Sequence, residues 1–409
     1  MSEWKKVKLG DCCEITSSKR IFLSDYVPVG IPFYRSKEIA EMQKGETISD
    51  PLFISNDKYE EIKCKFGIPN KGDLLLTAIG ATLGIPFVIK NNLPFYFKDG
   101  NLIWFKNFNE IVDSSFLYTW MCSSFGYQSM QNIAIGSAQK ALTISALKDM
   151  SLLVPPIETQ HRIATILSRY DSLIENYQKQ IKLLEESAQR LYKEWFIDLR
   201  FPGHENTKIV DGVPEGWEKK KISDVCDTIG GGTPSTKVQE YYEGGNISWV
   251  TPTDITRNNS LCLLSTEKKI TQEGLDHSSA KMLPEETILM TSRASVGYFG
   301  ICDFEVCTNQ GFISCVPFKK NFQMYLLYNL INRVDEIRIK AGGSTYLEIS
   351  KSVFRNFEII KPSDDVLNSF QQNVHKIIDK VRCLSKQIRH LTEARDRLLP
   401  KLMNGEIEV

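Results

Sequence analysis

The residue patterns that could perform catalysis are incomplete in this chain. Enzymes that methylate amino groups of DNA bases would carry an Asn/Asp-Pro-Pro-aromatic loop, whereas residues 154–157 read Val-Pro-Pro-Ile. Residues 230–233 read Gly-Gly-Gly-Thr without a following Gly-Lys-Ser/Thr, so they do not form a P-loop. A turn into the next strand is favoured there over a backbone nest for a phosphate. Glu267 and Lys269 lack the Pro-Asp that precedes them in a nuclease core. We therefore expect no catalytic residues.

Metal-binding spacings are missing as well. The chain has ten cysteines but no Cys-x-x-Cys, and the adjacent Cys12 and Cys13 suit no zinc site. Cys302 and Cys307 are separated by four residues, and no second pair stands at a matching distance. We expect no metal site and ten buried, reduced thiols. The five histidines are scattered along the chain: His161, His204, His277, His375 and His390.

Composition indicates core-forming domains without a dominant charge. The 409 residues are 42% hydrophobic, and 50 basic residues balance 50 acidic ones. A net charge of zero argues against a strong stand-alone nucleic-acid binder, which would carry a basic face. No apolar run approaches the roughly 20 residues of a membrane span. The first residues, MSEWKKVKLGDCCEI, contain no apolar signal-peptide core, so we expect a cytoplasmic protein.

Two stretches carry apolar residues at alternating steps of four and three, the heptad pattern of a helix that packs along another helix. The first seam comprises Tyr170, Ile174, Tyr177, Ile181, Leu184, Ala188, Leu191 and Trp195. The second comprises Ile377, Val381, Leu384, Ile388, Leu391, Arg395, Leu398 and Leu402, each 207 residues after its counterpart. Pairing within one chain is favoured by effective concentration, and we expect an antiparallel two-helix coiled coil. Pro400 predicts that the second helix ends or bends near Leu399, and Gly405 is a natural stop.

The duplication extends upstream of the seams. Residues 3–15 match 216–229, 31–39 match 247–255, 74–84 match 288–297, 98–105 match 308–316 and 136–145 match 342–350. The chain is therefore two copies of one α+β plan, each followed by a long helix. Each copy should contain one amphipathic helix, at about 113–130 and 322–338. The expected domains are 1–156, the helix 157–200, 201–363 with a linker at 201–216, and the helix 364–409.

Several motifs resemble the specificity subunit of type I restriction–modification systems. They are Trp-x-x-x-x-Leu/Ile-x-Asp at 4–11 and 217–224, GDLLLT at 72–77, GSAQK at 136–140, LYKEWFIDLRFPG at 191–203 and LLPKLMNGEIEV at 398–409. The second copy has GGSTYLEIS in place of GSAQK, and Arg395 stands in its seam.

The resemblance implies a non-catalytic subunit with two target-recognition domains that read a bipartite, asymmetric double-stranded DNA site, separated by the coiled coil. Two methylation subunits and up to two restriction subunits would assemble on it. S-adenosylmethionine, Mg and ATP would then be bound only by these partner subunits. A structural coiled-coil scaffold without DNA readout, and part of a self-sufficient methyltransferase, remain alternatives.

Within that resemblance, candidate DNA contacts are polar and basic loop residues, most of them at matching places in the two copies. Arginine suits guanine edges and lysine suits phosphates. The candidates are Lys19, Arg20, Arg35, Lys37, Gln139 and Lys140 in the first copy, and Thr251, Thr253, Arg257, Asn258, Arg293 and Tyr346 in the second.

Overall fold

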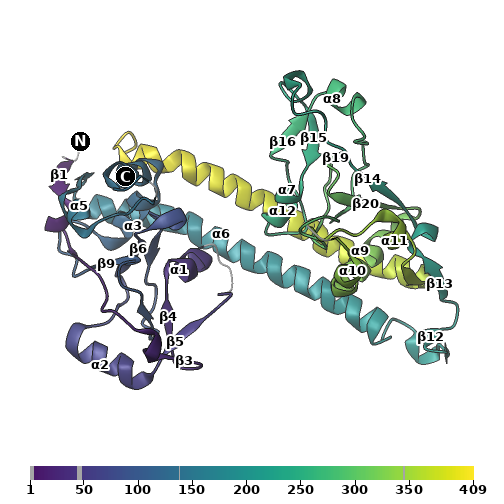
Figure 1. Cartoon of the computed structure of the whole chain (residues 1–409), viewed down its shortest axis with the longest axis horizontal. Coiled ribbons are helices and arrows are strands. Elements are labelled where there is room, and N and C mark those ends of the chain that lie inside the picture. Colours follow the sequence, from purple (N-terminus) through teal and green to yellow (C-terminus); the bar gives the residue numbers. More distant parts are fainter. Residues whose placement is uncertain (1–3, 44–47, 138, 344–345) are drawn as a thin grey trace. The chain divides into compact units, whose positions relative to one another are not determined.

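A computed structural model describes residues 4–43, 48–137, 139–343 and 346–409 (Figure 1). Ala138 of the GSAQK motif and Ser344 and Thr345 of its counterpart lie outside the described residues. The chain divides into two compact units. The first contains residues 1–175 and 391–409, and the second contains residues 176–390. Each long helix therefore contributes one half to each unit.

The first unit contains a head, residues 5–154, built on two four-stranded sheets. One sheet is antiparallel, with the order β2 (Glu14–Thr16), β9 (Leu102–Lys106), β6 (Leu74–Thr77) and β7 (Pro86–Val88). The other has the order β3 (Tyr26–Val27), β5 (Leu52–Ile54), β4 (Ile31–Tyr34) and β8 (Tyr96–Phe97), and its β4–β8 pair is parallel. A two-stranded ribbon of β1 (Lys5–Lys8) and β10 (Ser151–Val154) joins the two ends of the head.

The second unit contains a head, residues 218–361, with the same plan. Its antiparallel sheet has the order β14 (Cys226–Gly230), β20 (Phe312–Pro317), β17 (Ile288–Thr291) and β18 (Phe299–Gly300). Its smaller sheet has the order β16 (Lys268–Ile270), β15 (Ile247–Val250) and β19 (Cys307–Thr308), and the β15–β19 pair is again parallel. The closing ribbon is β13 (Glu218–Lys221) with β21 (Glu358–Lys361). A short hairpin of β11 (Ile209–Val210) and β12 (Val213–Pro214) precedes this head. The predicted internal repeat and α+β class are confirmed.

The amphipathic helix expected in each head is two helices. In the first head, α3 (Ser114–Cys122) ends at Ser123, which is extended and caps α4 (Ser124–Ile133) by accepting from the N–H of Gly126 at 2.9 Å. In the second head, α9 (Gln323–Asn332) and α10 (Val334–Lys340) meet at the non-helical Arg333. A side-chain oxygen that satisfies an exposed N–H favours a new helix start over continuation, which the apolar spacing alone did not reveal.

The remaining head helices are short. The first head has α1 (Ser36–Gln43), α2 (Asn56–Phe66) and α5 (Ile144–Asp149). The second has α7 (Pro252–Thr256), α8 (Gln272–Asp276) and α11 (Lys351–Arg355). Thr143 caps α5 and Ser350 caps α11, and these two caps are again 207 residues apart. The two copies therefore share the capped start of this helix.

The two long helices pair antiparallel, as the seams predict. Helix α6 (Ile157–Tyr192) continues as a π-helix, Lys193–Ile197, and α12 spans Asp364–Met403. In the second unit the end of α6 meets the start of α12, where the rings of Trp195 and Phe370 lie 5.7 Å apart. In the first unit the start of α6 meets the end of α12, where Arg395 donates to Asp171 at 2.7 Å.

Of the expected end or bend near Leu399, the end is wrong, because α12 passes through Pro400 and ends at Met403. Proline has no N–H, so α12 loses the one backbone bond that residue 400 would donate to the carbonyl oxygen of Asp396. Leu402 is 1% exposed and packs into the core of the first unit, which offsets the missing bond. Gly405 follows in the left-handed conformation, with φ +74°.

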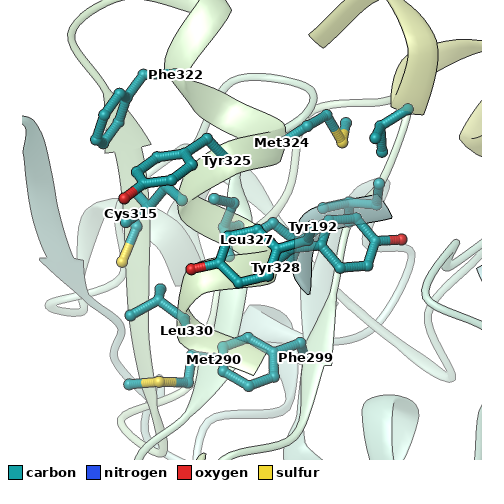
Figure 2. Close-up of a cluster of buried hydrophobic side chains, with 14 of the residues drawn as sticks. Tyr192, Met290, Phe299, Cys315, Phe322, Met324, Tyr325, Leu327, Tyr328 and Leu330 are labelled. Atoms are coloured by element: carbon teal, nitrogen blue, oxygen red, sulfur yellow. The ribbon is translucent and has the colours of Figure 1, made fainter. Parts of the chain in front are cut away.

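The core of the second unit mixes aromatic side chains with leucine, methionine and cysteine (Figure 2). Tyr192 from α6 packs beside Tyr325 from α9, with ring centroids 5.9 Å apart, and its hydroxyl accepts from Asn329 at 2.9 Å. The seam residues Ile174, Ile181, Trp195, Val381 and Leu384 are buried. Ala188 and Leu402 are also buried. Leu398 packs against the core of the first unit and Arg395 pairs with Asp171, and both are partly buried. The remaining seam residues are partly buried as well: Tyr170, Tyr177, Leu184, Leu191, Ile377, Ile388 and Leu391. The helices are therefore part of the unit cores.

Candidate nucleic-acid interface

The loop that follows the central strand of each head is held by a buried threonine. Thr77 ends β6, and its hydroxyl accepts from the N–H of Ile85 at 2.8 Å. Thr291 ends β17 and accepts from the N–H of Tyr298 at 2.9 Å. Both side chains are fully buried. Because a buried hydroxyl without a partner costs free energy, these bonds constrain the backbone of each loop in the same way.

A second loop packs beside the first in each head through matching backbone hydrogen bonds. The N–H of Leu142 donates to Ala78 at 2.8 Å, and the N–H of Ile349 donates to Ser292 at 3.0 Å. We call the described residues of 135–141 loop 1 and those of 342–348 loop 2. Each is closed by a reciprocal pair of backbone bonds, from 135 to 141 and from 342 to 348. The two loops are therefore equivalent, as their alignment predicted.

One glycine in each loop permits its turn. Gly136 has φ +101° and Gly343 has φ +130°. A Cβ at Gly136 would lie 2.5 Å from the carbonyl oxygen of Gln139, and one at Gly343 would lie 2.1 Å from that of Tyr346. Side chains other than hydrogen are excluded at both positions.

The two loops present different chemistry on this shared backbone. Loop 1 exposes the amide of Gln139 and the ammonium of Lys140 over an open hollow of about 540 Å³. The rest of the hollow is lined by Gly80, Ala81, Leu83, Tyr127 and Gln131. Loop 2 places Tyr346, 61% exposed, where loop 1 has Gln139, and Glu348 beside Arg293 at 3.7 Å. Sequence reasoning missed Tyr127 and Gln131, since they lie on a helix that the apolar spacing marked only as core.

Arg35 and Thr251 occupy equivalent places, at the start of α1 and α7, and their roles are structural. The N–H of Arg35 donates to Glu38 at 2.7 Å, and the N–H of Thr251 donates to Asp254 at 2.8 Å. The Arg35 guanidinium also pairs with Glu38, and this hydrogen bond raises its pKa. Asp50 lies 3.5 Å from the same guanidinium. Two carboxylates therefore already occupy this arginine.

The remaining candidates are dispersed. Lys19 lies over the ring of Phe66, Arg20 pairs with Asp99 at 3.1 Å, and Lys37 lies 3.9 Å from Glu41. Asn258 donates to the carbonyl oxygens of Ser260 and Cys262 and so closes a turn.

Thr253 lies within α7, and Arg257 directly follows that helix. Arg257 is exposed and has no side-chain partner among the described residues. Of the twelve candidates, Gln139 and Lys140 are brought together over one hollow, and Arg293 and Tyr346 lie on neighbouring loops of the other head.

The triple glycine at 230–232 is neither a turn into a strand nor a nest. Gly230 is the last residue of β14, and none of the three glycines has positive φ. A Cβ at Gly231 would lie 2.1 Å from the carbonyl oxygen of Thr308, and the N–H of Gly232 donates to that oxygen at 2.9 Å. These glycines permit close packing of two backbones, so both earlier interpretations are wrong.

The expectation that all ten thiols are buried is also wrong, because Cys64, Cys122 and Cys383 are exposed. They lie on α2, α3 and α12 respectively. Among the described residues, no three His, Cys, Asp or Glu side chains are placed to hold a metal ion. Within the same part of the chain, none of the helices has both the length and the apolar character to cross a membrane.

Comparison with known proteins places the chain in a family. The family described as "Type I restriction modification DNA specificity domain" matches residues 1–186 and 214–393. The HindI specificity subunit of Haemophilus influenzae is 26% identical over 474 aligned positions, which cover all of both chains. The MjaIX specificity subunit of Methanocaldococcus jannaschii is 27% identical over all of this chain and 94% of its own.

A solved structure shares the fold. The type I restriction–modification S subunit from M. genitalium superposes with a TM-score of 0.63, covering 98% of this chain and 96% of that one at 16% identity. The chain therefore belongs to the type I restriction–modification DNA specificity family, whose members are the non-catalytic specificity subunits of these systems.

Proposed function

We propose that this chain is the DNA-reading subunit of a type I restriction–modification complex, with each head contacting one half of a bipartite, asymmetric site. The observation that supports this most directly is the pair of loops 1 and 2. They share hydrogen bonds, glycine positions and helix caps, yet expose an amide and an ammonium in one head and a phenol in the other. Two loops with the same backbone and different exposed side chains suit the recognition of two different half-sites.

Side-chain chemistry assigns roles within this proposal. The amide of Gln139 matches the donor and acceptor on the major-groove edge of adenine, while Lys140 matches a phosphate or a guanine. Arg293 and Tyr346 are the corresponding contacts of the second head. Arg257, exposed at the end of α7, is a further phosphate contact of that head. Arg35, which two carboxylates occupy, is a positioning residue in this scheme.

Assembly completes the function. Methylation subunits and restriction subunits are the proposed protein partners, and they would bind S-adenosylmethionine, Mg and ATP, while this chain would bind no cofactor. The proposed location is the cytoplasm, where the host DNA lies. Because the net charge of the chain is zero and phosphate neutralisation provides most non-specific affinity, the isolated chain should bind DNA weakly and gain affinity on assembly.

The test is to map methylated adenines in the genome of cells that express the chain with its methylation subunits. Changing Gln139 and Lys140 to Ala should relax one half of the recognised sequence, and Tyr346→Ala should relax the other. A lost bidentate base contact costs about 1–3 kcal/mol, or roughly 5- to 150-fold in discrimination. Lys148→Ala, exposed on α5 but outside loop 1, is the matched control and should change nothing. Altered specificity in both halves from either variant would contradict the proposal.

A further inference from the structure

The second head is joined to α12 by a cluster of five charged side chains. Arg382 of α12 lies at its centre, with Glu286 of the head within hydrogen-bond distance and Asp303 of the head at 3.7 Å. Lys386, one turn later, contacts Asp303 at 2.7 Å, and Asp379 supports Arg382 at 3.1 Å. Across this contact the cations of the helix, Arg382 and Lys386, face the anions of the head, Glu286 and Asp303, while Asp379 of the helix pairs with Arg382.

The first head meets α6 through a pair of opposite polarity. Lys90 of the head donates to Glu175 of α6 at 2.5 Å. Here the head supplies the cation and the helix supplies the anion.

These two contacts occupy equivalent positions in the repeat. Glu175 and Arg382 are 207 residues apart, the offset that relates the two long helices. In the heads, the N–H of Gly72 donates to Ile89 at 2.9 Å, and the N–H of Glu286 donates to Cys302 at 2.8 Å. Lys90 and Asp303 are the next residues after these two acceptors. The central helix residue and its head partner therefore exchange charge between the two contacts, while Lys386 has the same charge as its counterpart Lys179.

We propose that these charge-reversed contacts make the first head selective for the first half of α6 (157–175) and the second head selective for the first half of α12 (364–390). A first head placed on α12 would bring Lys90 against Arg382 and Lys386, with Gly72 in place of Glu286. A second head placed on α6 would bring Asp303 and Glu286 against Glu175 at the position of Arg382, with Lys179 still at the position of Lys386. Like charges at each wrong contact would disfavour exchange of the two heads within a chain or between two copies of it. Lys90 and Asp303 are thus positioning residues for the two readers, and this role does not depend on which bases are read.

Burial makes the selectivity unequal. The Arg382 side chain is 12% exposed and Glu286 is 23% exposed, whereas Lys90 is 67% and Glu175 49% exposed. Exposed pairs contribute little, because water and salt screen them, while a partly buried cation facing another cation is strongly destabilising. The contact on α12 should therefore reject the wrong head strongly, and the contact on α6 only weakly.

The test is the thermal unfolding of full-length variants at low and high salt, with hydrogen exchange of residues 284–304. Asp303→Lys gives the second head the charge of the first and should lower Tm by about 3 °C or more and weaken the protection of that segment. Lys90→Asp makes the reverse change and should lower Tm by less than about 1 °C. Asp227→Lys on β14 and Lys71→Asp before β6 are exposed, and serve as matched charge-reversal controls.

Restoring opposite charge decides the mechanism. Adding Lys386→Glu to Asp303→Lys should recover at least half of the Tm loss at low salt, and adding Glu175→Lys to Lys90→Asp should recover its smaller loss. Asp303→Asn removes the charge without reversing it, and its Tm should lie between those of the parent and Asp303→Lys. This milder variant replaces Asp303→Lys in the test if the latter folds poorly. The proposal is overturned if Asp303→Lys costs no more than Asp227→Lys, or if Lys386→Glu restores nothing, since the loss would then arise from side-chain size.

Discussion

Loops 1 and 2 of the two heads have equivalent backbone hydrogen bonds but expose different side chains. Each has a glycine with positive φ and is closed by reciprocal backbone bonds, and each packs beside a loop held by a buried threonine. The features that differ are the exposed side chains, Gln139 and Lys140 in one and Tyr346 in the other. The comparison indicates that the two copies keep the same loop backbone and differ in the side chains that the loop exposes.

The seams of the long helices differ in the same manner, at one position. Ala188 in the second unit is completely buried, and its counterpart in the first unit is Arg395, which pairs with Asp171. The residue of the second unit that corresponds to Asp171 is Ile378, also completely buried. One unit therefore closes its seam with an ion pair, and the other with apolar contacts.

The largest expected effect comes from imposing the ion-pair solution on the apolar seam. Ala188→Arg would bury a guanidinium in the apolar seam without the carboxylate that Asp171 supplies in the first unit, since Ile378 stands at that position, and should destabilise the chain by about 3–5 kcal/mol. The reverse change, Arg395→Ala, should cost only about 1 kcal/mol or less, since Arg395 and Asp171 are partly exposed. Urea unfolding of both variants measures the difference.

Adding Ile378→Asp to Ala188→Arg would reproduce the first unit's pair and should regain part of the loss. Equal destabilisation by Ala188→Arg and Arg395→Ala would show that the two seams do not differ energetically.

A smaller effect tests the shared loop frame. Gly343→Ala places a Cβ 2.1 Å from the Tyr346 carbonyl oxygen at φ +130°, and should cost about 1–3 kcal/mol and abolish recognition of one half-site. Gly342→Ala is the control, since its Cβ would meet nothing within 4 Å and its φ is not positive. Gly136→Ala should repeat the result for the other half-site. Thermal unfolding and methylation mapping together check both, and tolerance of Gly343→Ala would disprove the role of the frame.

The sequence predicted what repeats and periodicity encode, and less of what depends on single side chains. The 207-residue offset predicted the paired helices, and the matching segments upstream predicted the two copies and the matching places of loops 1 and 2. It did not reveal the break at Ser123, because a cap depends on one hydroxyl that competes with an otherwise continuous apolar stripe. Pro400 was given too much weight, because the sequence does not show that Leu402 is held in a core.

The candidate DNA contacts were chosen by residue type, and the sequence did not show which of them already pair with other side chains of the chain. Arg35 looked like a reader of guanine, yet Glu38 and Asp50 occupy it. Such pairing depends on residues brought together by folding, here a helix cap and a loop. The charge exchange between Lys90–Glu175 and Asp303–Arg382 was likewise invisible, because the partners are far apart in the sequence and only the fold relates them.

The smallest expected effect concerns a carboxylate that has no counterpart in the first unit. Glu185 of α6 accepts from the N–H of Leu261 at 2.8 Å and from the hydroxyl of Ser260 at 3.1 Å, and the corresponding position of α12 is Thr392. Burial raises the pKa of Glu185 above its usual value of 4.5. Because the folded state then holds the proton more tightly than the unfolded state, this group favours folding fully below that usual value. The contribution is lost as the pH rises through the raised pKa.

Glu185→Gln should therefore remove a decline in stability that begins near pH 4.5, since its carbonyl oxygen can still accept both bonds while carrying no charge. The Tm of the variant should match that of the parent at pH 4 and exceed it slightly at pH 8. Thr392→Val, at the equivalent position of α12, is the control and should leave the pH dependence of the parent unchanged. Parallel Tm profiles of parent and Glu185→Gln between pH 4 and pH 8 would contradict the prediction, because they would show that the titration of Glu185 does not change stability.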